Sequence, residues 1–158
     1  ALDLKISKKV IEKTLPKLSF PGRYNYLKKG KIKKLLHRNE MIMIDGAHSP
    51  ADSANLYNYL KTVKLPKYGI WAMTKNKEPD LFIRQFKNIF EKIVTMPIDD
   101  ENSTEPAIKL NKIALKNKFN SEVSNSLIEA LKKITSKKKK LIVCFGSLYN
   151  CGNILNKN

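Results

Sequence analysis

The sequence predicts an α/β domain whose mostly parallel sheet is covered by helices on both faces. Two continuous apolar runs, 41–44 and 141–145, are typical of strands that are buried on both faces. Segments with apolar residues at helical spacing alternate with further apolar runs between them, as a parallel sheet with helical crossovers requires. The 158 residues suit one domain, and 42% of them are hydrophobic, which is enough for a sizeable core.

The first forty residues contain a predicted helix, a turn and a basic connector. Apolar residues recur between positions 10 and 18 at a spacing that predicts a short amphipathic helix, ending near Pro16. Phe20-Pro21-Gly22-Arg23 has the composition of a turn. Residues 28–38 are basic and only partly apolar, and we expect them to connect the turn to the first buried strand.

The helix after the strand at 41–44 carries clear start signals. Ser49 is a favourable N-cap residue, Pro50 falls at the first helical position, and Asp52 lies three residues after Ser49, as in a capping box. The apolar residues that follow at helical spacing are Leu56, Tyr57, Leu60 and Val63.

The remaining sequence continues the alternation of strands and helices. The predicted elements are a strand at 68–73, a helix from Pro79, a strand at 93–98, helices at 104–115 and 122–134, and a strand at 141–145. The helix from Pro79 is expected to present one apolar face made of Leu81, Phe82, Phe86, Ile89 and Phe90.

The net charge is strongly positive, because 31 Lys and Arg outnumber 14 Asp and Glu to give +17. Such a chain attracts anions, which include nucleic acids, nucleotides and acidic substrates. A nucleic-acid-binding module is therefore one alternative, supported by the basic stretches 28–38 and 137–140. These stretches are not interleaved with aromatic residues as a stacking surface would need. The other reading is compositional, with most lysines on a solvated surface.

The two cysteines, Cys144 and Cys151, lie in an apolar C-terminal stretch, away from other thiols and both histidines. We expect two buried free thiols, which fit a reducing cytoplasm, and no metal site. No apolar run approaches the length of about 18 residues that a membrane span needs, and the start shows no signal-peptide pattern.

Three stretches should meet at the carboxyl edge of the sheet, where ligands bind in such folds: 45–50, 74–79 and 146–149. In the first, Asp45 ends a strand, Gly46 allows close approach of the backbone, and His48 precedes a helix N-terminus, which favours an anion. Spacing alone also fits an ordinary strand-to-helix turn, with Asp45 in a capping role. A lone Arg23 in a turn is likewise compatible with simple exposure.

Three motifs in one order carry a resemblance. Phe20-Pro21-Gly22-Arg23, Asp45-Gly46-Ala47-His48-Ser49-Pro50 and Gly146-Ser147-Leu148-Tyr149 resemble the Trp-Pro-Gly-Arg, Asp-Gly-Ala-His-Asn-Pro and Gly-Ser-Leu-Tyr of folylpolyglutamate and dihydrofolate synthases. The resemblance runs from about position 10 to the end. This chain departs from the family pattern at Ser49, which keeps an N-cap, and at Asn76 and Glu78, which replace the usual acids of the middle loop.

The resemblance implies the C-terminal domain shared with the Mur ligases, a Rossmann-like three-layer α/β fold with a mostly parallel sheet of about six strands. Residues 1–19 would be an interdomain segment with the opening helix, and 20–158 the domain itself. The six glycines form no Gly-x-x-x-x-Gly-Lys-Ser/Thr motif, so we expect the N-terminal P-loop ATPase domain to be absent. The chain would then be an inactive monomer by itself, either a cut piece or the product of a shortened gene.

The family reaction activates a folate carboxylate as an acyl phosphate with ATP and Mg²⁺, and the amine of L-glutamate then attacks it. By resemblance, Arg23 would contact a phosphate, Asp45 the ribose, and His48 the phosphate region of ATP. Lys77 would bind the carboxylate of the incoming glutamate, with Ser147 a second candidate for that pocket. The resemblance implies no catalytic residue acting in isolation, no metal ligand and no tightly bound cofactor in this domain.

Two alternatives stay open at this point. Dihydrofolate synthase and folylpolyglutamate synthase activities cannot be separated, because pterin recognition lies outside this chain. A peptidoglycan-precursor ligase shares the implied fold, although Gly146-Ser147-Leu148-Tyr149 favours the folate branch.

Overall fold

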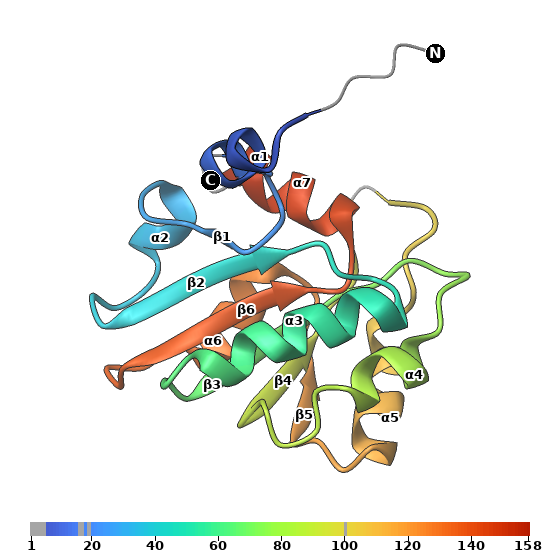
Figure 1. Cartoon of the computed structure of the whole chain (residues 1–158). Coiled ribbons are helices and arrows are strands. Elements are labelled where there is room, and N and C mark those ends of the chain that lie inside the picture. The colour runs from blue at the N-terminus through green and yellow to red at the C-terminus, as the bar shows by residue number, and fades with distance from the viewer. Residues whose placement is uncertain (1–5, 16–17, 19, 100) are drawn as a thin grey trace.

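The structure of the protein is a computed structural model, and it describes residues 6–15, 18, 20–99 and 101–158. In this part of the chain one six-stranded sheet has the order β1-β2-β6-β3-β4-β5, and only β1 runs antiparallel to its neighbour (Figure 1). The strands are β1 (Asn25–Tyr26), β2 (Glu40–Asp45), β3 (Lys67–Trp71), β4 (Lys92–Thr95), β5 (Ser121–Val123) and β6 (Lys140–Phe145).

The central strands end at the same edge. Asp45 of β2 and Trp71 of β3 both pair with Phe145 of β6, so the loops that follow these three strands are neighbours. The carboxyl edge of the sheet therefore brings together the stretches after residues 45, 71 and 145, as the sequence predicts.

Helices cover both faces of the sheet (Figure 1). They are α1 (Lys8–Thr14), α2 (Lys31–Lys34), α3 (Pro50–Thr62), α4 (Pro79–Arg84), α5 (Ala107–Lys116), α6 (Leu127–Ile134) and α7 (Leu148–Lys157). One apolar core joins the sheet to α6 and α7, and a second joins it to α3, α4 and α5. The described helices include none that is long and apolar enough to cross a membrane.

Strand β6 explains why the apolar runs in the sequence are continuous rather than alternating. Leu141, Val143 and Phe145 belong to the core on one face of the sheet, whereas Ile142 and Cys144 belong to the core on the other. Successive side chains of a strand point to opposite faces, so a strand covered on both sides must be apolar at every position.

The start of α3 agrees with the sequence. Pro50 is the first helical residue, and the Ser49 hydroxyl oxygen accepts a hydrogen bond from the N–H of Asp52 at 3.1 Å. The predicted opening helix is also present as α1, whose described residues are all exposed, while Pro16 lies outside the described residues.

The predicted helix at 122–134 was wrong in its first third. Residues 121–123 form the edge strand β5, in which Val123 pairs with Thr95, and α6 begins only after the cap at Ser126. The Ser126 hydroxyl accepts the N–H of Glu129, so the local helix start lies inside the predicted segment. Strand β1 was also missed, because two residues give no periodicity.

Other element boundaries also differ from the prediction, including the strands expected at 68–73 and 93–98, which end at residues 71 and 95. The helix from Pro79 ends at Arg84, and the Phe86 and Phe90 rings reach the core from the turn that follows, while Leu81 is exposed. Helix α5 starts at 107 rather than 104, since Thr104 forms an isolated bridge with Thr74. The connector at 28–38 contains the short helix α2.

The amino edge of the sheet holds a buried ion pair. Glu40 accepts hydrogen bonds from the N–H groups of His37 (2.9 Å) and Ser136 (2.7 Å) and from the Thr135 hydroxyl. Lys140, only 3% exposed, lies 3.5 Å from Glu40 and donates to the carbonyl of Ile134 at 2.7 Å. Burial raises the pKa of Glu40, but these hydrogen bonds and the Lys140 charge outweigh it, so the pKa lies below its ordinary value.

Both thiols are free and buried, as predicted. Burial, with a contribution from the Asp45 charge, raises the pKa of Cys151 to about 12, and burial also raises the pKa of Cys144. Neither thiol is therefore ionised near neutral pH, and both act as small apolar groups in the core.

Candidate functional site

The candidate site lies where β2 ends and a turn from the start of the chain folds back over it. The N–H of Gly46 donates to the carbonyl of Gly22 at 2.7 Å, which fixes the turn against the end of β2. Gly22 has a φ of +78°, a conformation that glycine adopts without strain. A Cβ at position 46 would collide with the Leu148 side chain, which would have to move to make room for it.

Asp45 holds this junction together from inside. Its side chain is 2% exposed, and its two oxygens accept the N–H groups of Tyr24 (2.9 Å) and Ala47 (2.8 Å). Burial raises the pKa of Asp45 despite these two hydrogen bonds, which favour the charged form. The carboxylate thus links the turn to the segment that leads into α3.

Arg23 returns to the same edge although it precedes Asp45 by 22 residues. Its Nη1 atom lies 4.0 Å from Asp45 Oδ1 and 3.8 Å from Asp52 Oδ1. The Arg23 side chain is 36% exposed, and both distances exceed hydrogen-bond length. The guanidinium is therefore held by charge at the mouth of the site, with donors left for a further anion.

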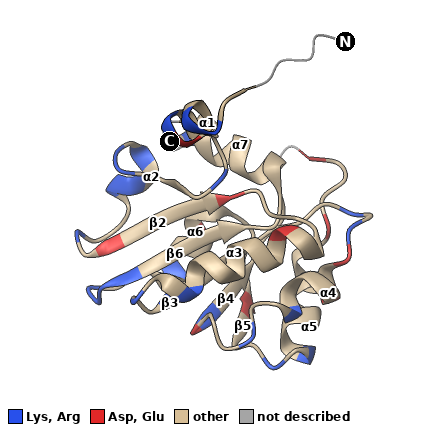
Figure 2. Ribbon diagram, viewed as in Figure 1, with Lys and Arg blue, Asp and Glu red and all other residues tan. Residues whose placement is uncertain are grey.

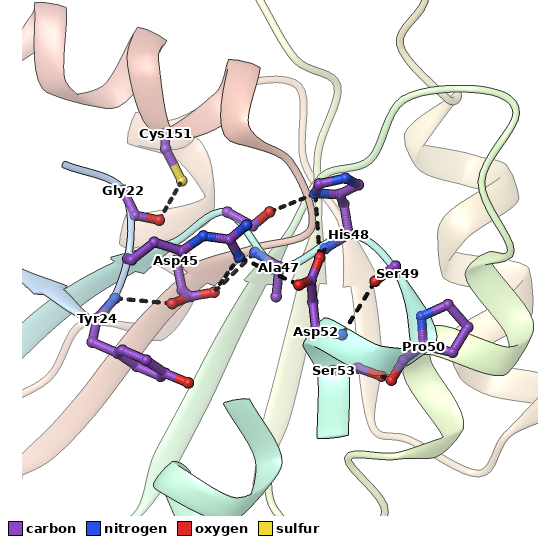
Figure 3. A network of polar contacts seen from close by, with 12 residues as sticks. Gly22, Tyr24, Asp45, Ala47, His48, Ser49, Pro50, Asp52, Ser53 and Cys151 are labelled. Atoms are coloured by element: carbon purple, nitrogen blue, oxygen red, sulfur yellow. Dashed lines mark hydrogen bonds and ion pairs between the residues drawn. The ribbon is translucent and has the colours of Figure 1, made fainter. Parts of the chain in front are cut away.

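His48 faces this cluster from the N-terminal side of α3. Its Nδ1 lies 2.8 Å from the carbonyl oxygen of Gly46 and 3.6 Å from Asp52 Oδ2 (Figure 3). A carbonyl can only accept, so Nδ1 carries the hydrogen and Nε2 is left for a ligand. The ring is 28% exposed, which leaves it accessible.

Asp52 is a site residue that the sequence analysis placed only in the helix cap. One of its oxygens accepts the N–H of His48 at 3.4 Å, and the other faces Arg23. Burial alone would raise the pKa of Asp52. The hydrogen bonds with the His48 N–H and Ser49 and the charge of Arg23 outweigh burial, so the pKa lies below its ordinary value and the carboxylate stays charged. Its place one helical turn after His48 was the signal that could have indicated a shared role.

A small cavity lies beside His48, and both predicted glutamate-binding residues line it. Its volume is about 110 Å³, and its walls include His48, Thr74, Lys77, Ser147, Leu148 and Tyr149. Ser147 is 3% exposed, and its hydroxyl oxygen accepts the N–H of Tyr149 at 3.2 Å as the cap of α7. All five predicted site residues thus lie around one edge of the sheet, with His48 between the two groups.

Charge at this edge is mixed, whereas basic residues dominate elsewhere (Figure 2). Asp45 and Asp52 offset Arg23, and the described residues contain no group of three or more His, Cys, Asp or Glu that could hold a metal ion. The site is thus able to position a polar, anionic ligand through Arg23, His48 and Lys77.

The family of dihydrofolate synthetase C-terminal domains matches residues 28–157. No match was found among curated proteins.

Solved structures of folate ligases share this fold. The structure described as Mycobacterium tuberculosis folylpolyglutamate synthase complexed with ADP is similar with a TM-score of 0.78 and 16% identity, over 96% of this chain and 35% of that chain. E. coli FolC in complex with DHPP and ADP gives 0.75 and 14%, over 98% and 35%. Bifunctional folylpolyglutamate synthase/dihydrofolate synthase from Yersinia pestis, complexed with AMPPNP and Mn ion, gives 0.77 and 15%, over 98% and 35%.

These structures are related to the chain by fold, and the chain spans about a third of their length. The sequence match covers most of the chain, from the basic connector to the last helix. The chain therefore belongs to the family of dihydrofolate synthetase C-terminal domains.

Proposed function

We propose that this domain supplies the ATP- and glutamate-contacting half of a folate ligase, which joins glutamate to dihydrofolate, tetrahydrofolate or dihydropteroate through an acyl phosphate. The observation that carries the proposal is the return of Arg23 to within 4.0 Å of Asp45, beside His48 and Asp52. An arginine with free donors at the carboxyl edge of a parallel sheet is well placed to meet a phosphate.

Arg23 and His48 are the proposed phosphate contacts. Negative charge on the transferring phosphoryl group needs cationic or hydrogen-bonding partners. The Arg23 guanidinium offers both, and His48 Nε2 can donate to a phosphate oxygen only when the ring carries a hydrogen on each nitrogen. Asp45 is expected to meet the ribose, but its burial and two backbone hydrogen bonds support mainly a role in holding Arg23's turn against β2.

Lys77 and Ser147 are the proposed glutamate contacts. The Lys77 ammonium can pair with a substrate carboxylate, and the N-terminal amides of α7 beside Ser147 favour the same charge. Because His48 lines this cavity too, glutamate bound there would lie next to the phosphate region. The amine must attack an acyl phosphate, so this adjacency is what the reaction needs.

The rest of the enzyme would come from the part of the relatives that this chain does not match. We assign to that part the phosphate cradle, the Mg²⁺ ligands and the folate pocket, and we expect a monomeric cytoplasmic domain that is inactive alone. When Mg²⁺ is bound there, it neutralises phosphate charge. The nucleic-acid alternative is weakened because Lys140, in one of its two basic stretches, is buried and paired with Glu40.

An NMR titration of the isotope-labelled chain with MgATP tests the proposal. We expect millimolar affinity and shifts confined to 22–24 and 45–52, because a half-site supplies few contacts. Arg23→Ala should remove these shifts, whereas Arg38→Ala, which changes an arginine in the basic connector, should leave them. Shifts centred on 28–38 and 137–139, lost steeply with salt and matched by random DNA, would instead support generic polyanion binding.

A further inference from the structure

A cavity next to Arg23 is lined by aromatic side chains, and none of these belongs to the proposed phosphate or glutamate contacts. Its volume is about 570 Å³, and its walls include Phe20, Arg23, Tyr24, Asn25, Tyr26 and Lys28. Arg23 lines this cavity and also belongs to the proposed phosphate site, so the two adjoin at this residue. A ligand that reaches from one to the other would carry an anionic group at one end and a flat apolar group at the other.

Tyr24 is held in this wall in an unfavourable backbone conformation. Its φ is +44°, in the left-handed region where a residue with a Cβ is strained. Its N–H donates to the buried carboxylate of Asp45, which fixes the conformation. Strain of this kind persists only where the surroundings impose it, and it clusters at ligand-binding sites.

The Tyr24 ring is braced on one side and open on the other. Its centroid lies 4.7 Å from that of Tyr59 on α3, at an angle of 46°. The Tyr59 hydroxyl in turn hydrogen-bonds the Tyr26 hydroxyl at 2.9 Å, which ties α3 to β1. Tyr24 is nevertheless 40% exposed, so a rigid aromatic surface faces solvent beside the phosphate site.

We propose that Tyr24 is the stacking surface for the base of the nucleotide whose phosphates meet Arg23. This inference rests on the proposed function and adds the residue that recognises the base. Neighbouring residues of one turn would then contact the two ends of the ligand, and the Asn25 amide offers hydrogen bonds to the edge of the base. Stacking of a base on an aromatic ring is strong and does not depend much on which base it is. Tyr24 would therefore raise the affinity for the nucleotide without selecting among bases.

A nucleotide fits this cavity better than the other flat substrate of a folate ligase. A pterin is also planar, but it carries no phosphate, and the cavity shares Arg23 with the proposed phosphate site. Lys28 adds a second cation to its walls, so the surroundings of the ring suit an anionic ligand.

Comparison of ATP with inorganic tripolyphosphate isolates the contribution of the base. In NMR titrations of the full chain with Mg²⁺ present, Tyr24→Leu should weaken ATP binding about tenfold or more. The same change should alter tripolyphosphate binding less than about twofold. Tyr24→Phe keeps the ring and should keep ATP affinity. Tyr57→Leu, on the same helix as Tyr59 but outside the cavity, is the matched control and should match the wild type.

Three results would overturn the inference. Unchanged ATP affinity in Tyr24→Leu would remove the ring from the base site. Equal losses for ATP and tripolyphosphate would show that Tyr24 only holds Arg23 in place. Pteroate that shifts the Tyr24 signals and competes with ATP poorly would assign the cavity to the pterin. A fourth result bears on the proposed function instead. If tripolyphosphate does not shift the signals of residues 22–24 in the wild type while ATP binding still depends on Tyr24, the phosphate role of Arg23 is contradicted.

Discussion

Asp52 lies beside both Arg23 and His48, the two proposed phosphate contacts, so we expect it to affect anion binding. It lies 3.8 Å from Arg23 and 3.6 Å from His48. Its carboxylate stabilises the start of α3 and the position of Arg23, but it also places a negative charge where a phosphate must approach. The two effects have opposite signs on stability and on ligand affinity.

We predict that Asp52→Asn strengthens tripolyphosphate binding by the isolated chain about two- to fivefold. The substitution removes one unit charge at a few ångströms from the ligand, which is worth about 1 kcal/mol when solvent screens it. Stability should fall by up to about 1 kcal/mol, because an acidic group is lost from the first helical turn. NMR titration and thermal unfolding measure the two quantities.

The control is Asp80→Asn, which removes an equivalent first-turn carboxylate from α4, where it pairs with Arg84 rather than with the site. It should leave tripolyphosphate affinity unchanged. Weaker binding in Asp52→Asn would mean that the carboxylate mainly orients Arg23, and the predicted sign would be wrong.

For Lys77 we predict an effect on the binding of glutamate and not of ATP. In a two-domain enzyme that carries this domain, Lys77→Ala should raise KM for glutamate about ten- to a hundredfold, because a charge-assisted contact worth about 1.5–3 kcal/mol is lost. KM for ATP should change little, since Arg23 and His48 remain. Steady-state kinetics with each substrate varied in turn gives both values, with Lys75→Ala on the same loop as the control. A glutamate KM that stays constant would exclude Lys77 from the glutamate site.

At the scale of elements, the pair between Glu40 and Lys140 ties the starts of β2 and β6 to the end of α6. Both residues are buried, and Thr135 and Ser136 complete the carboxylate's hydrogen bonds. We predict that Glu40→Gln lowers the free energy of unfolding by about 3–5 kcal/mol at neutral pH, because Lys140 is left as an uncompensated buried charge. Glu122→Gln, which breaks an exposed pair with Lys92, should cost less than about 1 kcal/mol.

The pH dependence follows from the lowered pKa of Glu40. A carboxyl group whose pKa is lower in the folded state adds stability above its unfolded pKa of about 4.3, and that stability is lost as the pH falls through the folded pKa. The difference between wild type and Glu40→Gln should therefore be constant from pH 8 to 6 and shrink below about pH 4. Thermal unfolding across this range checks it, and a difference that persists at low pH would contradict the linkage.

The sequence predicted the elements whose signals are local and long. The apolar run 141–145 and the Ser49-Pro50 helix start reappear in β6 and α3, because burial on both faces and capping leave strong patterns. Strand β5 could not be predicted, because its three residues include the exposed Glu122 and gain strand geometry only by pairing with β4. The end of α4 at Arg84 could not be predicted either, because Phe86 and Phe90 continue the helical spacing of apolar residues beyond the end of the helix.

The candidate site was predictable in composition but not in geometry. Motif resemblance named Arg23, Asp45 and His48, yet their meeting depends on the hydrogen bond between Gly46 and Gly22 and on the Asp45 contact to Tyr24. Both are tertiary contacts across more than twenty residues, which periodicity and spacing do not encode. The Tyr24–Tyr59 ring contact was missed for the same reason, because the two residues lie 35 positions apart.

At the scale of the whole molecule, one sheet carries both apolar cores, so the chain should fold as a unit without its partner domain. Strand β6 contributes side chains to both cores, and a disturbance on one face therefore reaches the other. We predict a single cooperative unfolding transition together with no turnover of ATP. The 158-residue sequence contains no P-loop, so phosphate charge in the transition state would lack that source of stabilisation.

Calorimetry and a coupled assay for ADP, run on the same preparation with MgATP, folate and glutamate, test both halves of this prediction. Coincident calorimetric and van't Hoff enthalpies would show two-state unfolding. Addition of the separately produced N-terminal domain of a folate ligase is the positive arm, and turnover that appears only then would assign the missing chemistry to that domain. Folate- and glutamate-dependent ADP release by the pure chain, persisting in Arg23→Ala, would contradict the half-site and require a second phosphate-binding site in this fold.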